Sequence, residues 1–438
     1  MRLRWVQRSA TRFMMALIVL ATSIAIAQSD DASKTQSDDA SKTQSQVESL
    51  VLELDAPQLA RRNAAEQAIF KLGSDALPFL PEDGTPLTPE VAQRLERVRT
   101  RIAKESAAAK VKKNVGDVRL GDAATVAKAL EAISRDSGIE FDHSAEDETP
   151  IEPYSAALPF WHAVDYVLDQ ADLDIDFYAS EGSTLTLRPR TENRSSRVDS
   201  AAYAGIFRLE PTMVTSRRVL TDATLSGMNI ELEIAWKPDS NPVGITLPLD
   251  QIKARIGNGI TIGPQEASGT IDIAPSNKLA MTTIQLPLVL PAGRPLEIES
   301  LSGQIKSMLP GDEKTFEFPL KLGVQTQTAE FVTVRLEEIR KNGPLHEVGL
   351  GVEYKSAGKA MESHRGWLLG NEIYVELADG TRQDHLGYEL YRHNESGIGI
   401  GYMFDIGEAV GESKLIYRTP TAVIESTIDF VIQDIPLP

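Results

Sequence analysis

The stretch Asn229-Ile230-Glu231-Leu232-Glu233-Ile234-Ala235-Trp236 decides the fold of the C-terminal half of this chain. Apolar side chains alternate with charged or small ones, and a period of two residues is typical of a β-strand with one buried face. Similar alternation returns in residues 331–336 and 398–404, with proline and glycine turn signals between the strands. We therefore predict two β-sandwich domains, over residues 203–327 and 328–438.

The alternation also predicts which side chains form the two cores. The expected core of the first sandwich contains Ile230, Leu232, Ile234 and Trp236, and that of the second contains Val332, Val334, Leu336, Ile400, Tyr402 and Phe404. A weak internal repeat relates the two regions, because Arg208-Leu209-Glu210 opens the first and Arg335-Leu336-Glu337 opens the second. We interpret this repeat as a duplication of one sandwich domain.

Residues 46–114 have the pattern of helices. Val47, Leu50, Val51 and Leu54 follow the spacing of one apolar helix face. Thr88 precedes Pro89, an arrangement typical of a helix start, and Val91, Leu95, Val98 and Ile102 continue the apolar stripe. We expect the basic residues Arg94, Arg97, Arg101 and Lys104 to lie on a solvated face.

Residues 115–190 alternate short strands with two helices. The stretches VAKALEAISRDSGIEF (126–141), LPFWHAVDYVLDQADLDIDF (158–177) and STLTLRP (183–189) carry that pattern. In these stretches the chain resembles the short N-terminal module of secretins and TonB-dependent receptors. The resemblance implies a small α+β domain that makes protein–protein contacts in the bacterial envelope. No pore or barrel domain follows, so transport does not carry over; polar residues 191–202 are expected to form a linker.

The N-terminus predicts export. Arg2, Arg4, Arg8 and Arg12 precede an uncharged, largely apolar run of 14 residues, and Ala25-Ile26-Ala27 has the pattern of a cleavage site. The run is short against the roughly 20 residues of a spanning helix, which favours a cleaved signal peptide over residues 1–27 rather than an anchor. Two copies of SDDASKTQ (29–36 and 37–44) then predict a disordered spacer over residues 28–45. We expect a periplasmic or secreted protein without disulfides.

The composition excludes several classes of partner and chemistry. A formal net charge of −18 argues against nucleic acid and anionic lipid as partners, and no segment after the signal is long and apolar enough for stable membrane insertion. The absence of cysteine removes disulfides, thiol nucleophiles and thiolate metal ligands. We expect no cofactor and no metal, and a C-terminal region 203–438 that folds alone by apolar burial.

Local motifs give one candidate binding cluster. Glu362, His364, Arg365 and Trp367 place charged groups and an aromatic ring within six residues, and tryptophan and arginine dominate recognition sites. The competing interpretation, which the sequence favours, is that Trp367 anchors the core of the second sandwich.

Other motifs favour structural roles. Gly397, Gly399 and Gly401 predict a close approach within a strand rather than a nucleotide loop, because no helix follows them. Asp172, Asp174 and Asp176 lack the glycine and glutamate of a calcium loop and are expected on a solvent face. His385 and His393, with Glu362 and His364, leave a zinc site open as an alternative.

These observations predict a multidomain α+β and all-β protein with N-terminal helices, a small α+β module and two C-terminal β-sandwiches of the immunoglobulin-like (Ig-like) type. The favoured function is non-enzymatic binding or scaffolding in the cell envelope, through contacts with other envelope proteins. One alternative is a hydrolase or carbohydrate-active protein with carboxylates on a sandwich face. Another is an accessory component of an envelope secretion machine.

Overall fold

The computed structural model describes residues 41–81, 85–114, 116–142, 148–275, 279–293, 295–354, 365–393, 397–407 and 409–438. The chain divides into two compact units, residues 1–103 and 104–438, which are described separately. The predicted signal peptide and most of the predicted spacer lie outside the described residues. Residues 41–45 are part of a helix that continues to residue 53, so the expectation of a disordered spacer up to residue 45 is wrong at its C-terminal end.

The first unit is built from helices around one apolar core. After the helix at 41–53 come α2 (Leu59–Leu72), the 3-10 helix η1 (Gly73–Phe79) and α3 (Pro89–Asn114). The Thr88 hydroxyl accepts a hydrogen bond from the backbone N–H of Val91 at 3.4 Å, as expected for a helix cap. The predicted stripe is buried: the core includes Val47, Leu54, Ala65, Ile69, Val91, Leu95, Val98 and Ile102.

One prediction for the first unit is wrong. Arg94 does not lie on a solvated face but is buried, where its guanidinium contacts Glu66 at 2.6 Å and Glu90 at 3.0 Å. Glu66 lies on α2, so this ion pair joins α2 to α3. A helical stripe predicts which positions face the core, but a partner on another helix is not visible in that pattern.

The α+β module follows in the second unit. Its elements are β1 (Val118–Arg119), α4 (Val126–Ser137), β2 (Glu140–Asp142), β3 (Ala157–Leu158), α5 (Phe160–Gln170), β4 (Leu173–Glu181) and β5 (Thr184–Pro189). A three-stranded sheet has the order β2-β5-β4, with β2 parallel to β5, and β1 pairs with β3. Gly138 ends α4 in the left-handed conformation at φ 76°, which glycine adopts without strain.

The first sandwich consists of two sheets that share one core. One sheet has the order β13-β8-β7-β6, and the other has the order β11-β10-β14-β9-β12, with β24 paired to β14. The predicted core residues Ile230, Leu232, Ile234 and Trp236 are all buried in it. The strands are β6 (Ala202–Ala204), β7 (Phe207–Arg217), β8 (Gly227–Trp236), β9 (Gly244–Pro248), β10 (Lys253–Ile256), β11 (Ile260–Ile262), β12 (Thr270–Ile273), β13 (Met281–Leu288), β14 (Glu297–Pro310) and β24 (Val423–Pro436).

The second sandwich has sheets of order β15-β23-β19-β20 and β16-β17-β18-β22-β21. Its shared core contains all six predicted residues, namely Val332, Val334, Leu336, Ile400, Tyr402 and Phe404. The strands are β15 (Glu313–Pro319), β16 (Gln325–Ala329), β17 (Val332–Asn342), β18 (Leu345–Tyr354), β19 (Ile373–Glu376), β20 (Arg382–Asp384), β21 (Gly387–His393), β22 (Gly397–Phe404) and β23 (Lys414–Pro420). Short 3-10 helices include η3 (Pro238–Ser240) and η7 (Arg365–Gly370).

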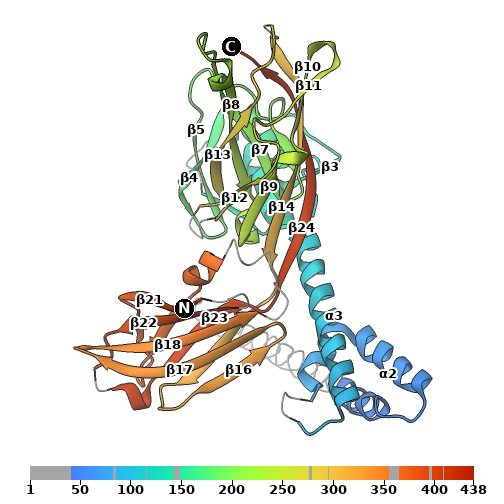
Figure 1. Ribbon diagram of the computed structural model, residues 1–438. Helices are drawn as coiled ribbons and strands as arrows, with labels where there is room; N and C mark the ends of the chain where they lie inside the picture. Colours follow the sequence, from blue (N-terminus) through green and yellow to red (C-terminus); the bar gives the residue numbers. More distant parts are fainter. Residues whose placement is uncertain are drawn as a thin grey trace, which may run out of the picture. The chain divides into compact units, whose positions relative to one another are not determined.

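Strand pairing moves the boundary between the sandwiches away from the predicted position at 327/328. β15 pairs with β23 and so belongs to the second sandwich, although it precedes residue 327. β24 returns to the first sandwich, where it pairs with β14 from Pro310↔Val423 to Glu297↔Pro436; Figure 1 shows the two strands side by side along this length. The last strand is sequentially distant from its partner, which is why alternation alone did not assign it correctly.

None of the described helices combines the length and the apolar character that crossing a membrane would require.

Candidate functional site

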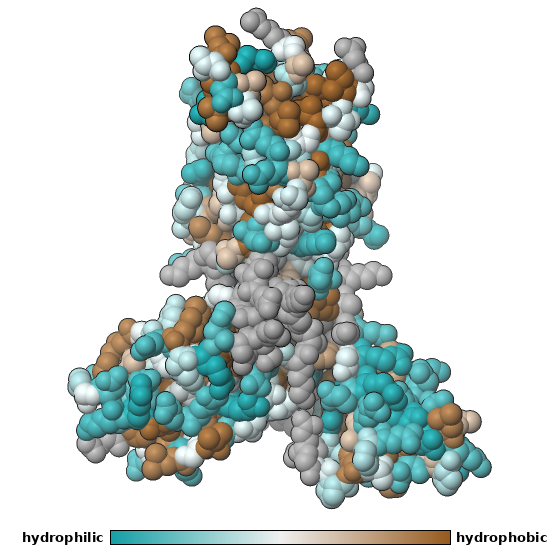
Figure 2. Space-filling model, viewed as in Figure 1, coloured by the Kyte–Doolittle hydropathy of each residue, from teal (hydrophilic) through white to brown (hydrophobic). Residues whose placement is uncertain are grey.

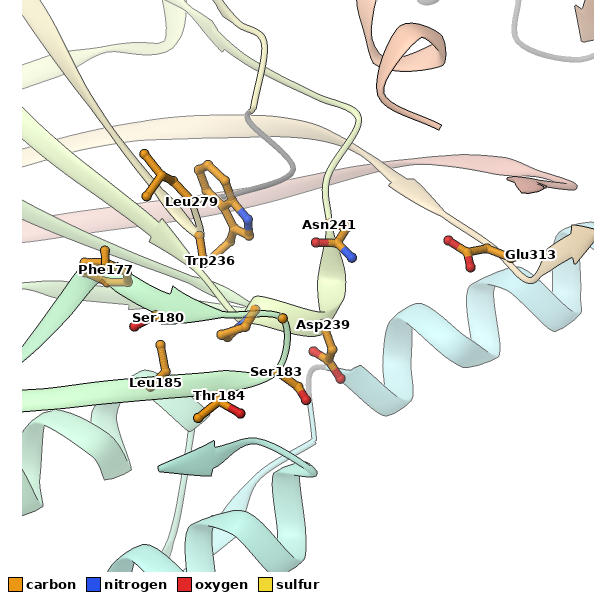
Figure 3. Close-up of a pocket in the computed structure, with 13 residues that line it drawn as sticks. Phe177, Ser180, Ser183, Thr184, Leu185, Trp236, Asp239, Asn241, Leu279 and Glu313 are labelled. Carbon is orange, nitrogen blue, oxygen red and sulfur yellow. The ribbon is translucent and has the colours of Figure 1, made fainter. Parts of the chain in front are cut away.

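A hollow of about 360 Å³ lies where the β4–β5 hairpin of the module meets the end of β8. The hairpin contributes Phe177, Ser180, Ser183, Thr184 and Leu185, and Figure 3 shows these side chains together with those of Trp236, Asp239, Asn241, Leu279 and Glu313. The lining thus combines hydroxyl, amide and carboxylate groups with aliphatic surface, over the buried rings of Phe177 and Trp236. None of the described residues that line it is a lysine or an arginine.

A second hollow of about 250 Å³ adjoins the first, because Asn241 and Glu313 line both. Its other lining residues are Val243, Pro310, Trp367, Gly370, Asn371, Glu372, Arg418 and Pro420. We call the two hollows together the groove. The hairpin, the segment after β8, the start of β15 and the helix η7 all contribute to it, so residues distant in sequence meet in one place.

Both carboxylates of the first hollow already have cationic partners. Lys237 Nζ lies 3.1 Å from Asp239 Oδ2, and Arg418 Nη2 lies 2.7 Å from Glu313 Oε2. The side chains of Asp239 and Glu313 remain 37% and 39% exposed, so each carboxylate is paired and still accessible from solvent. Paired, half-exposed carboxylates are suited to exchanging one cationic partner for another from a bound ligand.

Of the four predicted binding residues, the structure places one in the groove. Trp367 lines the second hollow, and its ring also packs against the second core, with an edge contact to Tyr354 at 5.6 Å. Its indole Nε1 is buried and has no hydrogen-bond partner among the described residues. Glu362 and His364 lie outside the described residues, as does the side chain of Arg365. Trp367 therefore packs against the core, as the competing interpretation expected, and lines the groove as well.

A buried charge cluster, which the sequence did not reveal, joins the module to the first sandwich. It consists of Asp165 on α5, Asp174 on β4, Arg194 and Arg197 in the predicted linker, Arg208 and Glu210 on β7, and Glu233 on β8. Arg208 and Asp165 are both fully buried, with Nη1 and Oδ1 2.8 Å apart. Arg197 bridges Asp174 at 2.6 Å and Glu210 at 2.8 Å.

The cluster overturns one expectation and adds to another. Residues 191–202 connect the module to the first sandwich, and Arg197 in this segment is 2% exposed and binds both domains. Asp174 is likewise 2% exposed and does not lie on a solvent face. The segment contains two arginines, Arg194 and Arg197, but sequence alone gives no way to pair them with Asp174 and Glu210.

The cluster shifts the pKa values of its carboxyl groups in both directions. Burial alone would raise the pKa of Asp174 and of Glu210, but Arg197 and Arg194 offset it, so both pKa values lie below their ordinary range. Burial raises the pKa of Asp165, and Arg208 opposes that effect without cancelling it. Ion pairing at the interface between the module and the first sandwich explains these pKa shifts. The cluster also fixes the hairpin that lines the groove.

The remaining motifs have structural explanations. A side chain at Gly399 would place its Cβ 2.6 Å from Tyr391, and one at Gly401 would lie 2.6 Å from Glu347, which confirms the predicted close approach on one sheet face. His385 packs its ring against Tyr402 at 5.2 Å, whereas Glu362 and His364 lie outside the described residues. Among the described residues, no group of three or more His, Asp or Glu is placed to hold a metal ion.

The chain matches no protein-family model, and no curated protein resembles it significantly in sequence.

Proposed function

We propose that this protein is a non-enzymatic binding or scaffolding protein of the bacterial cell envelope, and that it binds a segment of another protein in the groove. The observation that carries the proposal is the composition of the first hollow. Apolar surface from Leu279 and Ala280, over the buried side chains of Phe177, Leu185 and Trp236, lies beside hydroxyl, amide and carboxylate groups, and none of the described lining residues is a lysine or an arginine. Such a lining is suited to an extended peptide that contributes a basic side chain.

Three expectations from the sequence are part of this proposal. Export by a cleaved signal peptide places the protein outside the cytoplasm. The likeness of residues 115–190 to the short module of secretins and TonB-dependent receptors supports contacts with envelope proteins. We also propose that both sandwiches are Ig-like, a class of domain in which the loops at either end commonly bind partners.

The alternative of a hydrolase rests on the same two carboxylates. Asp239 and Glu313 lie in one hollow, and a pair of carboxylates is the minimum for glycoside hydrolysis. Each carboxylate contacts a cation of its own chain, which favours a recognition role over that of a general acid. A secretion accessory would use the groove as a binding protein does and would differ in the identity of its partner.

The test is site-specific photocrosslinking of the mature chain, residues 28–438, in the extracytoplasmic fraction. A crosslinker at Asn241, which lines both hollows, should capture a defined protein, and Glu313→Gln should reduce that capture at least tenfold. The matched control is a crosslinker at Lys341, an exposed residue of β17 that lines neither hollow. Equal capture from both positions, or turnover of a glycan or peptide that Glu313→Gln abolishes, would contradict the proposal.

A further inference from the structure

Among the described residues, three carboxylates line the groove, and the cations paired with two of them lie outside it. Asp239 pairs with Lys237, whose side chain is 5% exposed and lines neither hollow. Glu372 pairs with Arg382 at 2.6 Å, and the guanidinium of Arg382 also contacts Asp384 at 2.7 Å. Arg382 likewise lines neither hollow. These two carboxylates are therefore neutralised from outside the groove, and neither cation occupies the space of a ligand.

The third carboxylate, that of Glu313, differs because its cation lies inside the groove. Arg418 on β23 lines the second hollow, and its Nη2 lies 2.7 Å from Glu313 Oε2. Thr315 of β15 lies opposite Arg418, so Glu313 and Arg418 are diagonal neighbours on one face of the strand pair. Among the described residues, this ion pair is the one contact that the Arg418 side chain makes with a charged group. The two side chains are 52% and 39% exposed, and so exposed a pair is readily exchanged.

The surroundings of this ion pair suit a peptide better than an isolated cation. The side-chain amide of Asn241, which lines both hollows together with Glu313, is exposed and has no hydrogen-bond partner among the described residues. A primary amide offers a donor and an acceptor, as a peptide group does. The second hollow adds apolar surface from Pro310 and Trp367, which are partly exposed. A cationic side chain can therefore bind Glu313 while its own backbone pairs with Asn241.

We propose that Arg418 is an internal competitor for the groove. In the free protein its guanidinium occupies Glu313, and in the complex an arginine of the bound segment takes its place. The inference rests on the function proposed above and deepens it, because it names the ligand side chain and the carboxylate that receives it. The internal pair shows that Glu313 accepts a guanidinium at 2.7 Å, and a displaced Arg418 side chain stays in water. Removal of Arg418 should therefore tighten binding of an arginine-containing peptide about two- to fivefold, the range of an exposed ion pair.

The experiment uses two peptides, Gly-Leu-Arg-Leu-Gly and the same sequence with citrulline, which has the shape of arginine without its charge. Each carries a dansyl group at its N-terminus and an amide at its C-terminus, and fluorescence anisotropy gives its dissociation constant with the mature chain, residues 28–438. We expect the wild-type chain to bind the arginine peptide roughly threefold or more tightly than the citrulline peptide. Arg418→Gln should tighten binding of the arginine peptide about two- to fivefold and leave the citrulline peptide unchanged, whereas Glu313→Gln should abolish the difference between the peptides.

The matched control is Arg255→Gln. Arg255 pairs with Glu299 at 3.0 Å, and the two side chains are 57% and 37% exposed, close to the values for the groove pair. Its strand pairs with β14 at Ser300, and about 30 Å of β14 separates that position from Pro310 in the groove. Figure 2 shows a mixed hydrophobic and hydrophilic surface at this end of the first sandwich, where Figure 1 labels β10. The control changes the net charge by the same amount as Arg418→Gln, and it should leave both dissociation constants unchanged.

A double variant shows whether the competition acts through Glu313. Arg418→Gln combined with Glu313→Gln should bind the arginine peptide no more tightly than Glu313→Gln alone. Tightening that persists in the double variant, tightening with Arg255→Gln, or an unchanged dissociation constant in Arg418→Gln overturns the inference. An unchanged thermal melting curve shows that each variant is folded.

The proposed function fails in a different way. A crosslinker at Asn241 that captures no defined protein contradicts the envelope partner, even where Arg418→Gln tightens binding of the peptide. Capture at Asn241 together with equal binding of the two peptides by the wild-type chain contradicts the internal competitor and leaves the binding function standing.

Discussion

The two sandwiches carry the same Arg-Leu-Glu sequence on corresponding strands, β7 and β17. Each strand pairs with the next one along the chain. Each also has a β-bulge, which lies two residues after the motif in β7, between Pro211 and Met213, and at the last residue of the motif in β17, between Leu336 and Glu338. In both, the leucine lies in the sandwich core. The strands are therefore alike in pairing and inward face, whereas their β-bulges differ by two residues in position relative to the motif.

They differ in what covers the outward-facing arginine. Arg208 is fully buried against Asp165 of the module, whereas the Arg335 side chain is 37% exposed and pairs with Glu353 at 2.8 Å. The module also packs apolar residues against this face, since Ala235 of β8 belongs to the module core. The sequence of a strand therefore determines which side chains face outward, and the neighbouring domain determines whether an outward-facing charge is buried.

The largest effect is expected from Trp236→Ala in the first core. Trp236 is 1% exposed, and removing a buried tryptophan side chain costs about 3–5 kcal/mol through lost burial and the cavity left behind. Urea unfolding followed by tryptophan fluorescence measures the free energy of unfolding. Trp367→Ala, at a partly buried site, should cost less, about 0.5–3 kcal/mol. Equal costs would show that Trp367 is as deeply embedded as Trp236.

A comparable loss is expected from Arg208→Leu. The substitution leaves the fully buried Asp165 without its guanidinium partner, and breaking a buried pair on one side costs about 3–5 kcal/mol. The double variant Arg208→Leu with Asp165→Leu removes both charges and should recover part of that loss. Urea unfolding of the two variants is the measurement, and a double variant less stable than the single one would contradict this account of the cluster.

The sequence predicted the strands, both cores and the helical stripes because these follow from the periodicity of apolar residues. Ile230 and Trp236 needed no partner to be assigned to a core, since alternation alone places them on one face. The return of β24 to β14 was not predicted, because pairing between strands that are distant in sequence leaves no local signal. The same limitation hid the pairing of Arg197 with Asp174 and Glu210.

The candidate site was predicted in part. Trp367 stood out because tryptophan is rare and lay beside charged residues, and it does line the groove. Asn241 and Glu313, which line both hollows, are ordinary residues in sequence and become notable through their position alone. The groove is formed by the module hairpin, the end of β8 and η7, so it can be identified only from the tertiary structure.

Acid should destabilise the first sandwich and its module more than the second sandwich. Asp169, Asp174 and Glu210 have lowered pKa values, so they contribute stability above the ordinary carboxyl pKa, about 4, that is lost as the pH falls through their folded values. Asp165, whose pKa is raised by burial, opposes this loss in part. In the described part of the second sandwich, Asp379, on a turn, is the carboxyl with a lowered pKa, and the pKa of Glu330 is raised.

The first sandwich and its module are followed by the fluorescence of Trp161 and Trp236 in a Trp367→Phe variant. The second sandwich is followed by the fluorescence of Trp367 in a variant that lacks the other two tryptophans. Both variants are titrated below pH 4.5. The signal from the first sandwich should change at the higher pH. Simultaneous transitions would show that the two sandwiches unfold as one cooperative unit, and an earlier change at Trp367 would contradict the role given to the cluster.

The smallest effect is expected from Arg335→Leu, the counterpart of Arg208→Leu. The Arg335–Glu353 pair is partly exposed, with side-chain exposures of 37% and 27%, and exposed ion pairs contribute about 0–1 kcal/mol. A double-mutant cycle with Arg335→Ala and Glu353→Ala isolates the pair, and its coupling energy should fall further in high salt. A salt-insensitive loss as large as that of Arg208→Leu would mean that the outer face of β17 and β18 is also covered in solution. Both sandwiches would then have a covered outer face, and they would differ in the domain that covers it.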